Sequence, residues 1–299
     1  SDLYSWQPFS DQIDNYKKDQ NLYKNSLGNR VIFEEINHTL GLTFLYSWQA
    51  STKYGFVKKT KLLNHSGKKL YVKVIDGLRN ILPAGVSLRT QQEMSNLANA
   101  YKVSECNSDD NYALYYMNAL LMDKPDPGES LFSNIVWSHS SDNIELSVNE
   151  KSISTFLSND EFVKDHLLKG KEGSFLNYIH KPLLPDHEII WYIIADVQKS
   201  QSDISVIVSD LKGNDCIKDK IENSLADNYN AFEKNIGMAD GFQCTNINTN
   251  DLHHTANVTY NVLRGGIFFD NYTIQKNSFE LFLQKRSKKT FKAYQANIS

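Results

Sequence analysis

The sequence has few cysteines and no long uncharged apolar run. Its three cysteines among 299 residues, Cys106, Cys216 and Cys244, form neither a CxxC pair nor a Cys/His ligand set. We therefore expect reduced thiols, no disulfide framework and no metal site. The longest apolar stretch, residues 189–195, has the length of a strand, whereas a membrane-spanning helix needs about 20 residues. We expect no association with a membrane.

The sequence also lacks an excess of charge of either sign. It carries 32 basic and 35 acidic residues, for a net charge of −3, and this balance gives no electrostatic footprint for binding a phosphate backbone. A short basic run at residues 285–292 is typical of a solvated helix face or linker. We expect no nucleic-acid partner. No basic segment followed by an apolar run resembles a signal peptide, which together with reduced cysteines favours a cytoplasmic protein.

Strand patterns dominate the first two-thirds of the chain. Hydrophobic residues make up 40% of the sequence, which is enough for a sizeable core. The side chains of Leu42, Phe44, Tyr46 and Trp48 fall on one face of a period-2 strand. Residues 188–195 are almost continuously apolar, which predicts a strand buried on both faces.

A tight hairpin is the clearest local prediction. Residues 55–63 and 69–76 have strand patterns, and the connecting residues 64–67, Asn-His-Ser-Gly, include types that adopt the positive φ of a tight turn. Other strand patterns cover residues 30–35, 112–122, 134–139, 143–148 and 152–156.

Three segments have the apolar period of helices: residues 87–101, 216–235 and 251–263. Ser87 is the candidate N-cap of the first, and Gly265 with Gly266 is expected to stop the last. No internal repeat or low-complexity linker divides residues 1–290. The sequence therefore predicts one large, mainly β domain with helical excursions.

No arrangement of residues predicts a catalytic centre. The adjacent His253 and His254 point about 100° apart on a helix, and the HExxH spacing that places two histidines on one face is absent. Glu34 and Glu35 point to opposite faces of a strand, so the two carboxylates cannot flank one glycosidic bond. There is no GxSxG, GxxxxGK[ST] or GxGxxG motif. We therefore predict no catalytic residues and no cofactor.

The composition is rich in aromatic residues, with 16 Tyr, 15 Phe and 4 Trp. Aromatic faces stack on sugar rings, and planar polar groups of Asn, Gln and Arg pair with hydroxyl groups. The same composition also suits a hydrophobic core. For Trp48, Trp137 and Trp191 core packing is the favoured interpretation, most strongly for Trp191 in its apolar strand.

Two adjacent segments resemble a known family. Residues 54–64 and 70–85, with the motif Asp-Gly-Leu-x-Asn-Ile-Leu-Pro, are similar to the N-terminal domain of cellobiose phosphorylase and cyclic β-glucan synthase relatives. The resemblance implies a galactose-mutarotase-like antiparallel β-supersandwich, with two large sheets packed face to face. It also implies that a helical linker and an (α/α)6 barrel follow, and that the barrel carries the general acid and the phosphate-binding residues. Weaker similarities lie at residues 21–25, 33–37 and 257–266.

The resemblance implies a β-supersandwich domain at residues 1–270 and the start of a helical linker at residues 271–299. It further implies a non-catalytic, carbohydrate-binding or scaffold domain of a larger enzyme that acts on β-linked glucosides, with inorganic phosphate as co-substrate of the whole enzyme. Expected partners are a sugar or oligosaccharide, the catalytic barrel and a second copy in a homodimer. The candidate sugar-binding residues are Trp48, which would stack, and Arg79 and Asn80, which offer donors in a turn after a strand.

Two other functions remain open. A freestanding mutarotase-like hexose epimerase needs a histidine near a carboxylate, and His139 with Glu145 is the nearby pair in the strand region. A purely structural dimerisation module needs no ligand. Accelerated mutarotation of glucose favours the first alternative, and a concentration-dependent mass without ligand binding favours the second.

Overall fold

The computed structural model describes residues 3–10, 15–119, 128, 130–213, 216–266 and 275–298. The chain forms two compact units, Ser1–Asn228 and Tyr229–Ser299. Helix α5 (Ile217–Met238) includes the boundary between them. The boundary that the sequence predicts at residue 270 falls in residues 267–274, outside the described residues, so that division stays a prediction.

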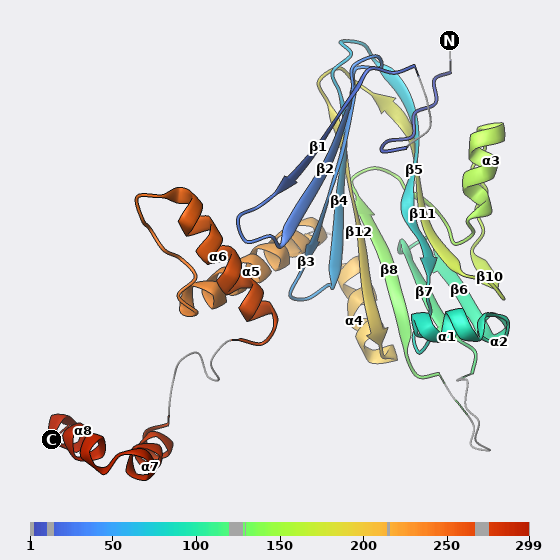
Figure 1. Ribbon diagram of the computed structural model, residues 1–299. Coiled ribbons are helices and arrows are strands. Elements are labelled where there is room, and N and C mark those ends of the chain that lie inside the picture. Colours follow the sequence, from blue (N-terminus) through green and yellow to red (C-terminus); the bar gives the residue numbers. More distant parts are fainter. Residues whose placement is uncertain are drawn as a thin grey trace. The chain divides into compact units, whose positions relative to one another are not determined.

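The first unit is built on two antiparallel sheets (Figure 1). The larger sheet has the strand order β1-β2-β3-β4-β12-β8-β7-β6-β10, and the smaller has the order β5-β11-β9. This arrangement confirms the predicted mainly antiparallel β fold with helices, although the two layers are unequal in size. The strands are β1 (Lys18–Lys24), β2 (Arg30–Asn37), β3 (Leu42–Ala50), β4 (Phe56–Asn64), β5 (Leu70–Ile81), β6 (Lys102–Asn107), β7 (Tyr112–Met117), β8 (Ser133–Ser140), β9 (Glu145–Ser147), β10 (Leu167–Lys169), β11 (Gly173–Leu183) and β12 (Glu188–Lys199).

The space between the two sheets holds the main hydrophobic core. Apolar side chains from β3, β4, β7, β8 and β12 meet those from β5, β9 and β11. Trp191 and Ile193 project into this core from β12 and are fully buried. On β3, Leu42 belongs to the core and Phe44 packs against it, with its ring centroid 6.3 Å from that of Trp191. The first two residues of the predicted row on β3, Leu42 and Phe44, therefore face the core.

Helices cover the opposite face of the larger sheet. Helix α4 (Gln201–Lys212) and the first part of α5 pack there through Ile207 and Ile221. Because Ile193 belongs to the core between the sheets and Ile194 to this second core, β12 is buried on both faces, as predicted. The sequence patterns do not predict α4, whose start is marked by a capping box at Ser200.

A buried ion pair joins the two sheets. Lys58 on β4 contacts Asp76 on β5, and the two side chains are only 9% and 11% exposed. Asp76 also accepts hydrogen bonds from Trp191 Nε1 at 2.8 Å and from Thr60 Oγ1 at 3.3 Å. The Lys58 ammonium lies 5.0 Å from the centroid of the Tyr46 ring, a cation–π distance. These contacts satisfy charges that are otherwise costly to bury.

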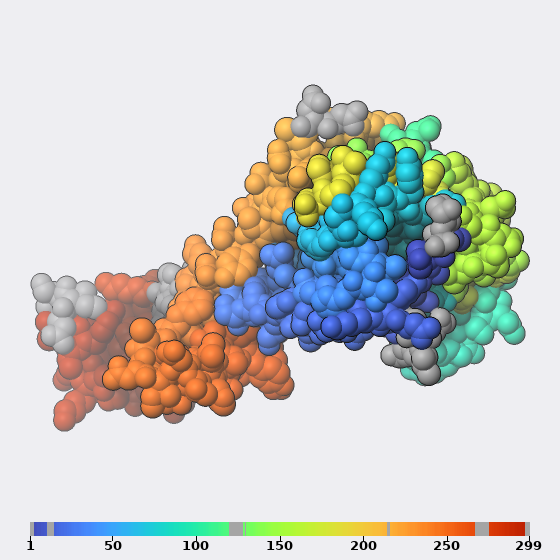
Figure 2. Space-filling view, turned by 90° about the horizontal axis from the view of Figure 1, so that it is seen from above, coloured from blue at the N-terminus to red at the C-terminus, as the bar shows by residue number. Residues whose placement is uncertain are grey.

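The predicted hairpin between residues 55–63 and 69–76 is wrong. β4 pairs with β3 and β12, whereas β5 pairs with β11 in the other sheet. The connection crosses between the layers, and Figure 2 shows it (cyan) beside the β11–β12 turn (yellow). Asn64 fixes this crossing, because its amide donates to the carbonyls of Leu183 and Leu184 at 3.0 and 3.1 Å. Two strand patterns joined by turn residues occur both in a hairpin and in a connection that crosses from one sheet to the other. The local sequence pattern therefore does not distinguish these two structures.

The predicted strand at residues 152–156 is also wrong. These residues belong to helix α3 (Lys151–Asn159). Ile153, Phe156 and Leu157 have the i, i+3, i+4 spacing of a helix face. A short apolar run fits both a strand and a helix. Because this run follows other strand patterns in the sequence, the sequence favours a strand, whereas the structure has a helix.

The helix predicted over residues 87–101 has two pieces. Met94 separates α1 (Leu88–Glu93) from α2 (Ser95–Tyr101). Ser87 caps α1 as predicted, since its hydroxyl accepts a backbone hydrogen bond from the first turn. The predicted strands at residues 112–122, 134–139 and 143–148 correspond to β7, β8 and β9, and residues 120–122 lie outside the described part.

The second unit is mainly helical in its described residues. After the end of α5 come α6 (Asn248–Leu263), α7 (Lys276–Arg286) and α8 (Lys288–Ile298). α6 confirms the predicted helix and its stop, because Gly265 has a φ of 84° and Gly266 donates a backbone hydrogen bond to the last turn at 2.8 Å. Within the described parts of both units, every helix is too short or too polar to span a membrane.

Candidate functional site

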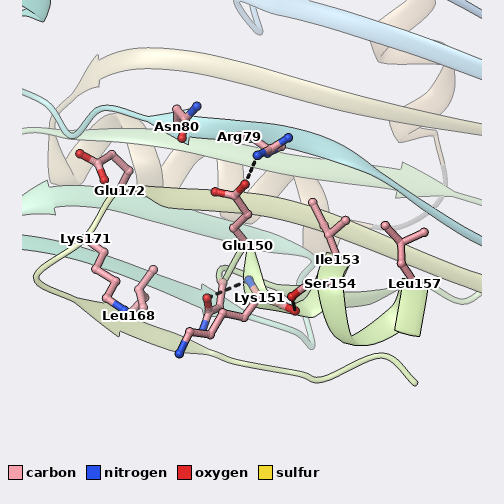
Figure 3. A pocket seen from close by; sticks show the side chains of 11 residues that line it. Arg79, Asn80, Glu150, Lys151, Ile153, Ser154, Leu157, Leu168, Lys171 and Glu172 are labelled. Atoms are coloured by element: carbon pink, nitrogen blue, oxygen red, sulfur yellow. Dashed lines mark hydrogen bonds and ion pairs between the residues drawn. The ribbon is translucent and has the colours of Figure 1, made fainter. Parts of the chain in front are cut away.

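An open pocket of about 450 Å³ lies beside α3 and is lined by the end of β5 in the smaller sheet and by β10 at the edge of the larger sheet (Figure 3). α3 covers the outer face of the smaller sheet, since Phe156 meets Tyr178 of β11 with ring centroids 6.0 Å apart. The end of β5, the start of α3 and the β10–β11 region form the walls. The lining residues are Arg79, Asn80, Asn149, Glu150, Lys151, Ile153, Ser154, Leu157, Leu168, Lys171 and Glu172.

Strand alternation positions Arg79 at the pocket. Leu78 of β5 packs against the core between the sheets, so the next side chain points to the outer face. Asn80 follows with a φ of 54°, in the left-handed region, which asparagine adopts more readily than most residues. The end of β5 therefore presents a guanidinium and an amide side by side.

Asn149 fixes the first turn of α3. Its Oδ1 accepts a hydrogen bond from Lys151 N at 3.1 Å, and its Nδ2 donates to Asp165 Oδ2 at 2.6 Å. The backbone N–H groups of Ser152 and Ile153 donate to carbonyls of the preceding turn at 3.1 and 3.0 Å. Because these helix amides already have partners, the groups that the pocket offers to a ligand are side chains.

Each carboxylate in the pocket has a cationic partner. Arg79 forms an ion pair with Glu150, and these side chains are 58% and 44% exposed. Glu172 accepts a hydrogen bond at 3.2 Å from Lys102, which is almost fully buried. A hydrogen bond from its own backbone, and then the contacts with Lys102, hold the pKa of Glu172 below its usual value against the opposing effect of burial. Glu172 is therefore ionised at neutral pH.

The pocket lining combines polar, charged and aliphatic side chains. Guanidinium, amide, ammonium and carboxylate groups line it together with the aliphatic side chains of Ile153, Leu157 and Leu168, and its lining includes no histidine, cysteine or aromatic residue. Elsewhere among the described residues, no three His, Cys, Asp or Glu side chains are arranged to hold a metal ion. Burial raises the pKa of the Cys106 thiol to about 11, which makes it a poor nucleophile. The polar groups suit the hydroxyls of a sugar.

Two of the three candidate sugar-binding residues line the pocket. Arg79 and Asn80 are adjacent in the pocket lining. Trp48 lies on β3 in the larger sheet, where it is opposite Lys58 in the register with β4 and on the same strand face as Tyr46. It is therefore absent from the pocket lining, and any stacking by Trp48 belongs to a different surface.

Sequence reasoning missed the residues that α3 contributes to the pocket. Because residues 152–156 are predicted as a strand, the sequence does not predict the helix face that carries Ile153 and Leu157. A usable signal was present in Asn149, because an asparagine two residues before Lys151 is typical of the entry to a helix.

His139 and Glu145 do not form the pair that an epimerase needs. Trp137 of β8 faces the core under the helices, so His139 shares that face, and its ring lies 6.3 Å from the ring of Tyr192. Leu146 of β9 faces the core between the sheets, so Glu145 points away from it and pairs with a lysine at 3.1 Å. The two side chains are on opposite outer faces. Burial, and then nearby Lys218, lower the pKa of His139.

Comparison with known proteins gives structural similarities only. No family model matches the chain, and no curated protein matches it. A protein named as a kojibiose phosphorylase from the human microbiome aligns with a TM-score of 0.41 and 10% identity, over 71% of this chain and 25% of that one. A bacterial glucoamylase complexed with acarbose aligns with a TM-score of 0.44 and 10% identity, over 80% and 31%. A family GH92 α-mannosidase from Bacteroides thetaiotaomicron aligns with a TM-score of 0.38 and 9% identity, over 77% and 26%. This chain thus spans less than a third of each of these proteins.

Proposed function

We propose that this chain is a non-catalytic, carbohydrate-binding and scaffold part of a larger carbohydrate-active enzyme, and that the pocket at Arg79 and Asn80 binds a sugar. The observation that carries the proposal is the lining of the pocket, where hydrogen-bonding side chains from separate elements line an open space of about 450 Å³. Pockets of about 300–1,000 Å³ are typical of small-ligand sites. Activity on β-linked glucosides, with phosphate as co-substrate, belongs to the whole enzyme under this proposal.

The roles of the pocket residues follow from their chemistry. Asn80 offers both a donor and an acceptor, which match a pair of neighbouring hydroxyls. Arg79 is more than half exposed, so it can keep one contact with Glu150 and donate its remaining N–H groups to a sugar. Leu157 and Leu168 supply apolar surface for the C–H face of the ring.

The alternatives differ from this proposal in what they predict. Epimerase activity is not supported, because His139 and Glu145 are on opposite outer faces. A structural dimerisation module predicts a mass that rises with concentration in sedimentation and no binding of any saccharide. Dimerisation and packing against a helical catalytic barrel are also roles that the proposed domain can have, so sugar binding is the discriminating property.

Isothermal titration calorimetry of the full 299-residue chain with a panel of β-linked disaccharides tests the proposal. We expect at least one disaccharide to bind. Asn80→Gly removes the amide and keeps a residue that tolerates a positive φ, and Arg79→Ala removes the guanidinium. Each substitution is expected to weaken binding by about tenfold, the usual effect of losing a hydrogen bond to a charged or well-placed polar group.

Trp48→Leu is the matched comparison, because Trp48 lies outside the pocket. We expect this substitution to leave the affinity unchanged, with circular dichroism confirming that each variant is folded. Absence of binding heat across the panel rules out direct sugar binding. Loss of binding in Trp48→Leu, with normal binding in Arg79→Ala, places the sugar on the larger sheet instead.

A further inference from the structure

The charges around the pocket do not cancel. Glu150 is paired with Arg79, and Glu172 is paired with a buried lysine. Lys151 at the start of α3 and Lys171 before β11 also line the pocket, and within the described residues neither of them has an ion-pair partner. The pocket therefore presents two exposed lysine side chains that form no ion pair with a carboxylate.

We propose that the saccharide bound in this pocket carries a negatively charged substituent: a carboxylate, a sulfate ester or a phosphate ester. The inference rests on the proposed function, since it assumes that the pocket binds a sugar. The sugar hydroxyls contact Arg79 and Asn80, and the anionic substituent lies near Lys151 and Lys171. Figure 3 shows Arg79 facing Glu150 in one part of the pocket and Lys171 beside Leu168 in another.

The geometry favours an anionic sugar over a free inorganic anion. The first backbone amides of α3 already donate to Asn149 and to carbonyls, so the helix start lacks the free N–H groups that usually hold a bare anion. Leu157, Leu168 and the Asn80 amide also line the pocket, and these groups give a sugar ring contacts that a small anion cannot use.

Four ligands with one skeleton test the proposal by calorimetry at low ionic strength. The probes are cellobiose, cellobiouronic acid, cellobiose 6′-sulfate and cellobiose 6′-phosphate. We expect at least one of the three acidic ligands to bind about tenfold more tightly than cellobiose. Each of the two exposed lysines is expected to increase the affinity about threefold, and the two factors multiply. The advantage should shrink as salt screens the interaction. Comparing the three acidic ligands shows which anionic group the pocket prefers.

Charge-removing variants locate the effect. Lys151→Gln and Lys171→Gln are each expected to weaken binding of the preferred acidic ligand by about threefold, with no change for cellobiose. Lys169→Gln is the matched control, because it removes the same charge from an exposed residue of β10 outside the pocket lining. It should leave all affinities unchanged.

The outcomes separate the two proposals. If cellobiose binds and no acidic ligand binds more tightly, the inference is overturned and the proposed sugar binding stands. If none of the four ligands binds and the disaccharide panel also shows no heat, both are overturned. If inorganic sulfate binds as tightly as cellobiose 6′-sulfate, the pocket is an anion site and the inference is again overturned.

Discussion

Two ion pairs in the first unit have the same chemistry but differ in burial. Lys58 and Asp76 lie between the two sheets and are about nine-tenths buried, and Asp76 accepts further hydrogen bonds from neighbouring strands. Arg79 and Glu150 lie at the pocket and are about half exposed. The first pair cannot change partners without opening the sandwich, whereas the second is accessible to a ligand. Burial therefore separates a contact that supports folding from one that is available for binding.

The difference in burial between the two ion pairs arises from nearby positions on one strand, β5. Asp76 and Arg79 are three residues apart on β5, so they point to opposite faces of the smaller sheet. Gly77 between them allows β5 to approach β11 closely, because a Cβ atom at this position would lie 2.0 Å from Phe175 O. The Asp-Gly-Leu-Arg-Asn segment thus combines an inward charge, a close strand contact and an outward polar pair.

The largest expected effect comes from breaking the buried pair. Asp76→Ala leaves Lys58 charged and without its carboxylate, so we expect the free energy of unfolding to fall by about 3–5 kcal/mol in urea denaturation. The double variant Lys58→Met with Asp76→Leu removes both charges and is expected to lose much less. Equal losses in the single and double variants would contradict the role given to the buried charge.

Glu35 extends the comparison to a buried carboxylate held by neutral donors. It accepts hydrogen bonds from Trp6 Nε1, Phe9 N and Gln20 Nε2 at 2.7–2.8 Å. Glu35→Ala leaves these donors without their acceptor, so we expect a loss of about 2–3 kcal/mol and faster chymotryptic cleavage near Trp6. Unchanged cleavage would show that the N-terminal segment is held by other contacts.

The contribution of Glu172 to the free energy of unfolding is expected to depend on pH. Its pKa is lowered in the folded chain, by its own backbone and then by Lys102, so its contribution to stability is present above its unfolded-state pKa and is lost as the pH falls through the folded value. We expect Glu172→Gln to cost about 0.5–1 kcal/mol at pH 7 and progressively less below about pH 4. A difference between wild type and variant that persists at the acid end of the titration argues against this ionisation.

The smallest effect on stability is expected at the exposed pair. Arg79→Ala should change the free energy of unfolding by no more than about 0.5 kcal/mol, because solvent screens an ion pair this exposed. Urea denaturation of this variant beside Asp76→Ala measures the contrast directly. A loss at Arg79 comparable to that at Asp76 would mean that the pocket pair is structural.

Local patterns predict much of the fold but little of its pairing. The alternation in β3 and the apolar run in β12 identify core strands correctly, because these signals come from burial on one or both faces. The β4–β5 connection is misassigned, because the partners of a strand depend on contacts distant in sequence, such as those of Asn64 with Leu183. The predicted turn at Arg79 and Asn80 is wrong, because β5 continues through both residues to Ile81. The α3 residues that complete the pocket are not predicted, because residues 152–156 are misassigned to a strand.

Hydrogen–deuterium exchange with and without a saturating saccharide tests the central claim most directly. With the tightest-binding cellobiose derivative as ligand, we expect slower exchange at residues 79–82, 149–154 and 168–172, around the pocket. We expect no change at residues 44–60, which contain Trp48 and Lys58. Protection of residues 44–60 without protection of the pocket segments would contradict the assignment of the outer face as the binding surface.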